Sequence, residues 1–355
     1  MTTTRRRLIG VLLLAAMTAL AAGCGGSGGS GSGGSGSGRS TVLVGAGSTL
    51  VAPLVAQWSG DYAKKTGATI TYGAIGSGGG IAQITARTVD FGASDAPLSR
   101  DQAQACKRCL QVPWALAATL VSYNVKGAPA KLKLDGPTLA GIYLGKITSW
   151  NDPAIAKLNP GASLPATKIT PVFRSDGSGD TYAFSDFLSK VSPEWKSKEG
   201  VSAQVGFPTG VGGKGNDGVA AVVGRTDGAL GYLAISYVFA NKLDYALIEN
   251  AAGKFPVPRA ESISAAAAAA TTIPADNAIS LTNPPASAPA AYPVSTFTYA
   301  LVPQSSAKAK AKALRDFFTY AIGPGQRFAP RLQFARLPAR VLEADRQTIA
   351  KIGSS

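Results

Sequence analysis

One short loop combines groups that attract an anion with groups that repel one. Residues 174–184 read RSDGSGDTYAF. Arg174, Asp176 and Asp180 thus lie close to two glycines, directly before a segment whose apolar residues recur at helical spacing. A glycine-rich loop that opens a helix favours anions, because its free N–H groups and the helix dipole both attract negative charge. The two carboxylates would repel a simple anion. The loop therefore predicts an anion site whose ligand must suit carboxylates as well.

Two further glycine-rich loops have the same setting. Residues 45–50 (GAGSTL), 76–80 (GSGGG) and 176–180 (DGSGD) each follow a predicted strand and open a predicted helix. In open α/β sheets, ligands collect beyond the carboxyl ends of the strands, where helix N-termini point. Each loop alone could be no more than a tight turn. Together they predict helix N-termini that converge on one small, multiply negative oxyanion.

Composition excludes several other kinds of chemistry. The chain has 355 residues, a formal net charge of +15 and no histidine. The length favours two domains, and the missing histidine removes His-based triads, general bases and metal ligands. Residues 210–218 (GVGGKGNDG) do not have the spacing of a nucleotide-binding P-loop. We therefore expect a bare oxyanion as ligand, with no metal and no cofactor.

The elements that would position these loops alternate along the chain. Apolar and β-branched runs predict strands at 41–47, 68–76, 89–94, 115–125, 169–173, 229–236 and 294–303. Helical spacing of Leu54, Val55, Trp58 and Tyr62 predicts a helix that Gly67 ends. Further helices are predicted at 79–87, 137–144, 180–190, 217–225, 305–322 and 338–352, and the alanine-rich residues 264–270 favour helix surface. This order predicts an α/β protein with largely parallel sheets.

The first 40 residues are typical of an export and anchoring segment. Residues 1–23 have a basic start, an apolar run and small residues before Cys24. The Ala-Ala-Gly sequence before Cys24 is similar to a bacterial lipobox, in which the cysteine is lipidated; the alternative is an ordinary signal peptide with an incidental cysteine. The remainder of 24–40 is almost entirely glycine and serine, which predicts a flexible tether.

Cys106 and Cys109 form the sequence CKRC. Zinc would require further ligands that the chain does not offer nearby, and a redox pair would need a thioredoxin-like context. In an exported protein, a small structural disulfide is the favoured interpretation.

Several segments resemble one known family in their order along the chain. They include GAGSTLVAPLVAQW, YGAIGSGGGIAQI, VDFGASDAPLS, RSDGSGDTYAF and GGKGNDGVAAVV. They resemble the phosphate-specific periplasmic binding protein of the phosphate ABC transporter. The resemblance implies a two-lobed type II binding-protein fold, in which each lobe is a mostly parallel sheet flanked by helices and the ligand lies in the cleft between them. One lobe would comprise 41–115 plus 293–355, and the other 116–292.

The resemblance also implies a function and a place. The protein would be a monomer on the extracytoplasmic face of the cell membrane, held by its lipid anchor. It would bind inorganic phosphate and deliver it to the membrane subunits of an ABC permease, without catalysing a reaction. An exported phosphate-ester-acting enzyme with Ser178 as nucleophile is the alternative, although no base is evident for that serine.

The family motif assigns phosphate contacts to Thr49, Leu50, Ser77, Asp95, Arg174, Ser178 and Gly179. Phosphate near neutral pH still carries a proton, so the Asp95 carboxylate could accept a hydrogen bond from it, whereas sulfate would meet repulsion. Asp176 is interpreted as the partner that orients Arg174. Taken without the resemblance, Asp95 could instead be a turn former and Asp176 a loop cap.

Asp180 departs from the family pattern, in which threonine is common at this position. We expect its carboxylate to cap the helix that begins near Thr181. The alternative is that it accepts a second proton from dihydrogen phosphate.

The C-terminal part of the chain is basic. Residues 305–355 contain ten Lys or Arg and three Asp or Glu. The favoured interpretation is a solvated helix face, and the alternative is a positive field that attracts phosphate or anionic envelope polymers. Nucleic-acid binding is not expected, because aromatic residues are not interleaved with the basic ones.

Overall fold

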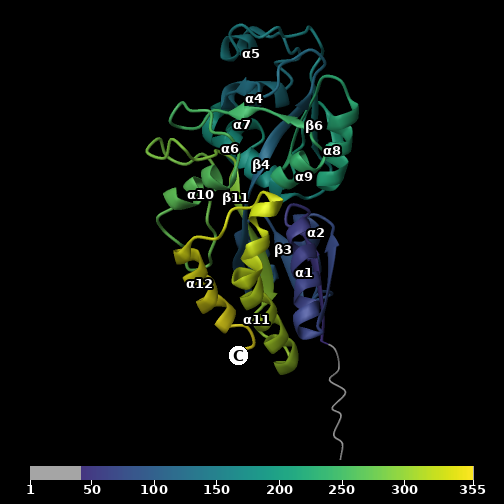
Figure 1. Ribbon diagram of the computed structural model, residues 1–355, viewed down its shortest axis with the longest axis vertical. Helices are drawn as coiled ribbons and strands as arrows, with labels where there is room; N and C mark the ends of the chain where they lie inside the picture. The colour runs from purple at the N-terminus through teal and green to yellow at the C-terminus, as the bar shows by residue number, and fades with distance from the viewer. Residues whose placement is uncertain (1–40, 355) are drawn as a thin grey trace, which may run out of the picture. The chain divides into compact units, whose positions relative to one another are not determined.

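The computed structural model describes residues 41–354 (Figure 1). The strands are β1 (Val42–Gly47), β2 (Thr69–Ala74), β3 (Phe91–Ser94), β4 (Cys109–Asn124), β5 (Lys133–Leu134), β6 (Thr170–Arg174), β7 (Val211–Gly213), β8 (Ala229–Ala234), β9 (Asp244–Tyr245), β10 (Leu247–Ile248) and β11 (Ser295–Pro303). The α-helices are α1 (Ala52–Thr66), α2 (Ser77–Thr85), α3 (Arg100–Ala105), α4 (Gly136–Tyr143), α5 (Pro153–Leu158), α6 (Gly179–Val191), α7 (Pro193–Lys198), α8 (Gly215–Arg225), α9 (Ile235–Ala240), α10 (Ala260–Ala269), α11 (Lys308–Ile322) and α12 (Ala339–Ala350). The predicted signal segment 1–23 and the tether 24–40 with Cys24 lie outside the described residues.

One mixed sheet of nine strands runs through the described chain, and β5 and β10 form a separate parallel pair. Its main path runs β2-β1-β3-β11-β4-β8-β6-β7. At one end β1 pairs in parallel with β2 and β3, and at the other β6 pairs in parallel with β7 and β8. Between them, β11 and β4 pair antiparallel with each other. The predicted α/β class with largely parallel sheets is thus confirmed for the two outer parts, while the strands that join them are antiparallel.

The long strand β4 pairs with strands at both ends of this sheet. Its residues 109–118 pair with β11, and its residues 119–124 pair with β8. The fold therefore has two lobes, the first on β2, β1, β3 and β11 and the second on β8, β6 and β7. Figure 1 shows α1, α2, α11 and α12 around the first lobe and α4, α6, α7 and α8 around the second. The first lobe combines strands from both ends of the described chain.

Each lobe has an aromatic core of its own. The first packs Trp58, Phe91, Trp114, Phe317 and Phe318 together, with ring centroids 5.2–5.9 Å apart. The second packs Tyr143, Phe184, Phe207 and Tyr232, with centroids 4.5–6.2 Å apart. Aromatic pairs at such spacings stabilise a core beyond the effect of their buried area. The two aromatic clusters share no residue, so each lobe has its own aromatic packing.

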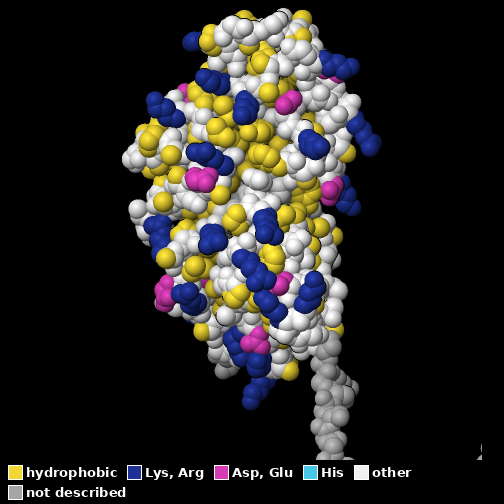
Figure 2. All heavy atoms as spheres, in the orientation of Figure 1, with side chains coloured by type: hydrophobic (Ala, Val, Ile, Leu, Met, Phe, Trp, Pro, Cys, Tyr) yellow, Lys and Arg dark blue, Asp and Glu magenta, His cyan; other side chains and the backbone are white. Residues whose placement is uncertain are grey.

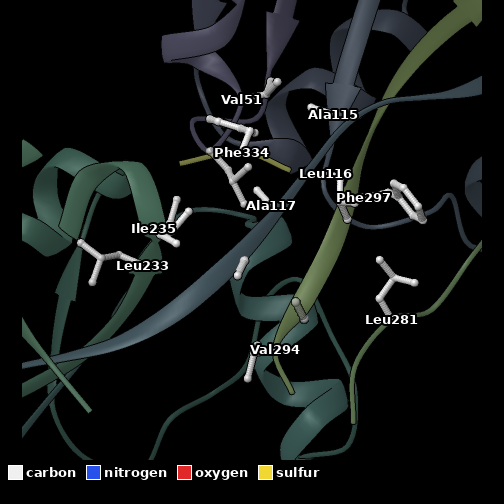
Figure 3. Close-up of a cluster of buried hydrophobic side chains, with 14 of the residues drawn as sticks. Val51, Ala115, Leu116, Ala117, Leu233, Ile235, Leu281, Val294, Phe297 and Phe334 are labelled. Carbon is white, nitrogen blue, oxygen red and sulfur yellow. The ribbon is translucent and has the colours of Figure 1, made fainter. Parts of the chain in front are cut away.

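Apolar side chains also pack where β4 and β11 run from one lobe to the other. Figure 3 shows Leu116 of β4 beside Phe297 of β11, which is its partner in the strand register. Val294, directly before β11, is likewise fully buried. These two antiparallel strands therefore form a packed connection between the lobes.

The segments with helical or alternating apolar spacing form the helices and strands predicted for them. In α1 the buried positions are Leu54, Val55, Trp58 and Tyr62, and the helix ends at Gly67, which has a left-handed φ of 72°. β4 is longer than predicted and begins at Cys109, although Pro113 lies inside it. A proline interrupts a central strand except at an irregularity. The register with β11 shifts at this point, since Tyr299 pairs with Pro113 and Thr298 with Ala115.

The CKRC segment forms a tight turn between α3 and β4. Cys106 and Cys109 are joined by a disulfide, as favoured from the sequence. Lys107 and Arg108 between them have φ values of 45° and 65°. Arg87 donates hydrogen bonds to the carbonyl oxygens of Cys106 and Lys107, at 2.8 and 3.1 Å. The disulfide thus closes a turn that a basic side chain also holds.

The basic C-terminal region has an amphipathic helix at its start. α11 buries Leu314, Phe317 and Phe318, whereas Lys308 and Lys312 are exposed. Lys and Arg side chains are frequent over α11 in Figure 2. Lys312 pairs with Asp316 one turn away, at 2.7 Å. The helix thus has the solvated face that its sequence favours. In the described part of the chain, no helix is both long enough and apolar enough to span a membrane.

Glycine at position 80 allows α2 to lie directly against the strands of the first lobe. A Cβ atom there would be 2.6 Å from Gly47 Cα and 2.7 Å from the carbonyl oxygens of Ala46 and Ala93. All three are backbone atoms, so none can rotate away. Gly80 therefore fixes the position of Ser77 at the start of the same helix.

We expect Gly80→Ala to destabilise the protein by about 1–3 kcal/mol, the usual cost of overpacking. Gly60→Ala is the matched control, because a Cβ at exposed Gly60 in α1 meets nothing within 4 Å. The control should stabilise the helix by about 0.5–1 kcal/mol. Urea unfolding in phosphate-free buffer measures both. Equal effects of the two substitutions would show that the contact of α2 with β1 and β3 is not tight.

Candidate anion-binding site

The glycine-rich loops of the two lobes meet each other directly. The backbone N–H of Gly179 donates to Ser77 Oγ at 3.1 Å, and that of Gly78 donates to the Gly177 carbonyl oxygen at 2.9 Å. These contacts join the start of α2 in the first lobe to the start of α6 in the second. A Cβ at Gly179 would be only 2.3 Å from Asp95 Cβ, so this approach requires glycine. Helix N-termini from both lobes therefore converge, as the loop pattern predicted.

Asp95 follows β3 directly and is 1% exposed. Its Oδ1 accepts hydrogen bonds from Ser48 Oγ at 2.5 Å and Thr298 Oγ1 at 2.8 Å. Its Oδ2 accepts one from Ser77 Oγ at 3.3 Å. Burial, followed by the charge of Asp180, raises the pKa of Asp95 to about 7. Burial thus opposes the ionisation of this carboxyl group in the ligand-free site.

Arg174 ends β6 in the second lobe and is 4% exposed. Its Nε and Nη2 donate to the two carboxylate oxygens of Asp176, at 2.8 and 2.6 Å. Asp176 also accepts from the backbone N–H of Gly215 at 2.9 Å, at the start of α8. Although burial raises its pKa, the hydrogen bond and charge of Arg174 hold the pKa of Asp176 below its usual value. This bidentate pair fixes the plane of the guanidinium group.

The expectation that Asp180 caps α6 is wrong. Ser178 is the N-cap, because its Oγ accepts the backbone N–H of Thr181 at 3.3 Å. Asp180 instead points into the site and is 0% exposed. It accepts from Arg174 Nη1 at 2.9 Å, Thr119 Oγ1 at 2.7 Å and Asn216 Nδ2 at 2.9 Å. A serine directly before the first helical residue is the better cap, which leaves the aspartate free to bind the arginine.

Thr49 lies just before α1 and contacts the second lobe. Its Oγ1 accepts from Asn216 Nδ2 at 2.8 Å, and its carbonyl oxygen accepts from Tyr237 OH at 2.9 Å. The Leu50 side chain is fully buried in the first lobe. The Leu50 side chain therefore cannot contact an anion at the junction of the lobes.

Sequence reasoning missed Asn216, which contacts both lobes. It is 0% exposed and lies in the first turn of α8. Its Nδ2 donates to Thr49 and Asp180, and its Oδ1 accepts a hydrogen bond from the backbone N–H of Ala234 at 2.7 Å. The segment GGKGNDG contained the signal, since it has a polar residue directly after a glycine that opens a helix. Ser48 and Thr298, the partners of Asp95, were missed as well.

Two cavities flank the meeting point of the loops. One, of about 410 Å³, is lined by residues that include Gly78, Pro97, Gly177 and Tyr182. The other, of about 430 Å³, is lined by residues that include Pro53, Asp217, Tyr237 and Arg331. Both are formed by residues from both lobes. Asp95, Arg174 and Asp180 line neither cavity, so this polar cluster is a buried site at the junction of the lobes.

Comparison with known proteins agrees with this arrangement. The chain matches the model of the PBP superfamily domain over residues 31–324. It is 46% identical over 309 residues to the phosphate-binding protein PstS of Xylella fastidiosa (strain Temecula1), with 86% of this chain and 84% of the relative covered. It is 42% identical to the phosphate-binding protein PstS of Pasteurella multocida, with 86% and 89% covered.

Solved structures support the fold. A high-affinity periplasmic phosphate-binding protein bound with phosphate superposes with a TM-score of 0.70 at 22% identity, covering 86% of this chain and 93% of that one. A phosphate-binding protein from Stenotrophomonas maltophilia gives 0.69 at 21% identity, covering 87% and 94%. The two lobes and the site at their junction define a periplasmic-type binding protein, and the chain belongs to the PBP superfamily. Within it, the chain belongs to the family of PstS phosphate-binding proteins.

The raised pKa of Asp95 predicts how stability depends on pH. The unfolded carboxyl has a pKa of about 3.9, so between pH 4 and 7 Asp95 binds more protons in the folded, phosphate-free protein than in the unfolded chain. The free energy of unfolding should therefore fall with rising pH in this window, by at most about 1.4 kcal/mol per pH unit from this group. Asp95→Asn should flatten the profile, and urea unfolding at pH 4.5, 5.5, 6.5 and 7.5 measures it. Parallel profiles for the two proteins would contradict a raised pKa at Asp95.

Proposed function

We propose that this protein binds inorganic phosphate outside the cytoplasmic membrane and delivers it to an ABC permease for import. The observation that carries the proposal is a fully buried carboxylate, Asp95, set against the N-terminus of α6 and close enough to Arg174 for the arginine's charge to act on it. Such a combination suits an oxyanion that is also a hydrogen-bond donor. Membership of the PstS family supports the same ligand.

Each proposed contact supplies one kind of hydrogen bond. The hydroxyl groups of Thr49, Ser77 and Ser178 and the backbone N–H groups of Leu50 and Gly179 donate to phosphate oxygens. Arg174 donates as well and supplies the positive charge, while Asp176 keeps its guanidinium in position. Ser77, which now contacts Asp95 and Gly179, exchanges those contacts for the anion.

Asp95 provides the selectivity in this proposal. Phosphate near neutral pH retains a proton and can donate it to the carboxylate. Sulfate has no such proton, so its oxygens would face a buried negative charge without a hydrogen bond.

Phosphate would be enclosed and released by movement of the two lobes. We propose lobe boundaries at 41–115 plus 293–355 and at 116–292. Strand β4 changes its partner from β11 to β8 between Ala118 and Thr119, close to the first of these boundaries, and β11 begins at Ser295, close to the second. Hinge motion about a few residues is the usual way in which two-lobed proteins enclose a ligand. A monomer suffices, because both sides of the site come from one chain.

We further propose that residues 1–23 are a signal peptide and that Cys24 carries lipid. The glycine- and serine-rich segment up to residue 40 would then be a tether between the membrane and the binding domain. A tethered domain remains close to its permease while it samples solution for phosphate.

The competing function, an enzyme that acts on phosphate esters, lacks a nucleophile with a base. Ser178 Oγ accepts the N–H of Thr181 as helix cap. Among the hydrogen bonds of the described residues, none links Ser178 Oγ to a carboxylate. The contacts of this serine therefore favour a binding role over a catalytic one.

Calorimetric titration of domain 39–355, stripped of bound anion, tests the function directly. We expect one phosphate per chain and no effect of excess sulfate. Asp95→Asn should weaken phosphate about 10- to 100-fold, the usual effect of losing a hydrogen bond to a charged group, and should allow sulfate to bind. Asp217→Asn, at an exposed position in α8, is the control for loss of one negative charge. Equal binding of both anions by the unaltered domain would contradict selective recognition.

The anchor is tested separately in the full chain. We expect the intact mass of the membrane-associated protein to correspond to a chain that starts at Cys24 with a diacyl adduct. Cys24→Ser should move the protein to the soluble fraction, because the tether alone has no apolar surface. Recovery of an unmodified Cys24 thiol from the membrane fraction would refute lipidation.

A further inference from the structure

The two buried aspartates of the site have the same pattern of hydrogen bonds. An ionised carboxylate can accept about four hydrogen bonds, two at each oxygen. Asp95 accepts two at Oδ1 and one at Oδ2. Asp180 accepts two at Oδ2, from Arg174 and Asn216, and one at Oδ1, from Thr119. Each carboxylate therefore has room for one more donor.

The charges of the site are also unusual for an anion receptor. The carboxylates of Asp95, Asp176 and Asp180 lie around the guanidinium group of Arg174. Among residues 41–354, Arg174 is the basic side chain whose hydrogen bonds place it in the site. Asp176 already makes a bidentate pair with Arg174. A second carboxylate, Asp180, then bonds the same guanidinium. With all three carboxyl groups ionised, an anion with two charges would enter a site that is already negative.

Protons on the ligand remove this conflict. The dibasic form of phosphate carries one P–OH group, whereas the monobasic form carries two and only one negative charge. Two P–OH donors match the two open acceptor positions, one on each lobe. A buried acceptor that remains unpaired is costly, so the form with two donors is favoured.

We propose that Asp180 is a specificity-determining residue that makes the site select monobasic phosphate. This inference rests on the proposed function, since it concerns the charge state of the same ligand. In this proposal Asp95 distinguishes phosphate from sulfate, and Asp180 requires a second P–OH group on the bound phosphate.

The other groups around Asp180 do not change this balance. Tyr232 of β8, Tyr237 of α9 and Tyr72 of β2 face the carboxylates, and burial raises the pKa of each well above its usual value. They remain neutral at physiological pH and supply no charge. Burial, opposed by the charge of Arg174, likewise raises the pKa of Asp180, which is consistent with a site that holds an extra proton.

Proton balance gives a direct test. Above neutral pH, free phosphate is mostly dibasic, so formation of the complex takes one proton from solution: dibasic phosphate plus one proton gives bound monobasic phosphate. We expect the unaltered domain 39–355 to take up about one proton per phosphate at pH 8, and its affinity for total phosphate to fall about tenfold per pH unit in this range.

Calorimetry in two buffers with different ionisation heats measures this uptake, with inorganic phosphate as the probe. Asp180→Thr should bind phosphate at pH 8 with almost no proton uptake, because one carboxylate suits the dibasic form. Asp180→Asn is the second variant, because the amide oxygen of asparagine can still accept the hydrogen bond from Thr119 Oγ1 while the negative charge is removed. Asp217→Asn is the charge control and should behave as the unaltered domain does. Urea unfolding verifies that each variant is folded.

The outcomes separate this inference from the function on which it rests. Equal uptake by the unaltered domain and both Asp180 variants would overturn the role of Asp180. If the unaltered domain binds phosphate at pH 8 without taking up a proton, that result alone would overturn the proposed role of Asp180. No phosphate binding by the unaltered domain at any pH from 5.5 to 8.5 would instead overturn the proposed function.

Discussion

The burial of one guanidinium group determines much of the arrangement around the site. Arg174 is 4% exposed, and a buried charge is unfavourable by several kcal/mol unless it is paired and hydrogen-bonded. Its partners come from two positions in one loop, Asp176 before the helix and Asp180 inside its first turn. The loop must therefore turn tightly between them, which its glycines permit. Asp176 in turn fixes the start of α8 through Gly215.

The lobes are joined in two different ways, and the difference suits a protein that opens and closes. Strand β4 connects them, because it pairs with β11 of the first lobe and with β8 of the second, and apolar side chains pack along it. The loops meet instead through hydrogen bonds among small or polar groups, such as Ser77 with Gly179 and Thr49 with Asn216. Opening would expose these polar groups to water, which can replace their hydrogen bonds at little net change in free energy. Only the permanent connection depends on the hydrophobic effect.

The sequence predicted the parts of this fold that have strong local signals. Helices with a buried stripe, such as α1, were found with their ends, and so were the glycine loops that converge. The six-residue helices α3, α5, α7 and α9 were missed, since fewer than two turns cannot establish a period. Asp180 was misjudged for a different reason. Both Ser178 and Asp180 are good caps, and which of them accepts the helix N–H depends on the partners that tertiary structure brings to the aspartate.

The close approach of the loops is the reason why we assign the proposed selectivity to the carboxylates. Gly78 and Gly177 are in van der Waals range of each other, and Gly179 has no room for a side chain beside Asp95. What remains to face an anion there is largely backbone N–H groups and hydroxyls, which bind any small tetrahedral oxyanion and do not titrate near neutral pH. Size and shape thus admit phosphate and sulfate alike. Discrimination by charge and by proton count can come only from groups that accept a proton, and Asp95 and Asp180 are the buried ones at this junction.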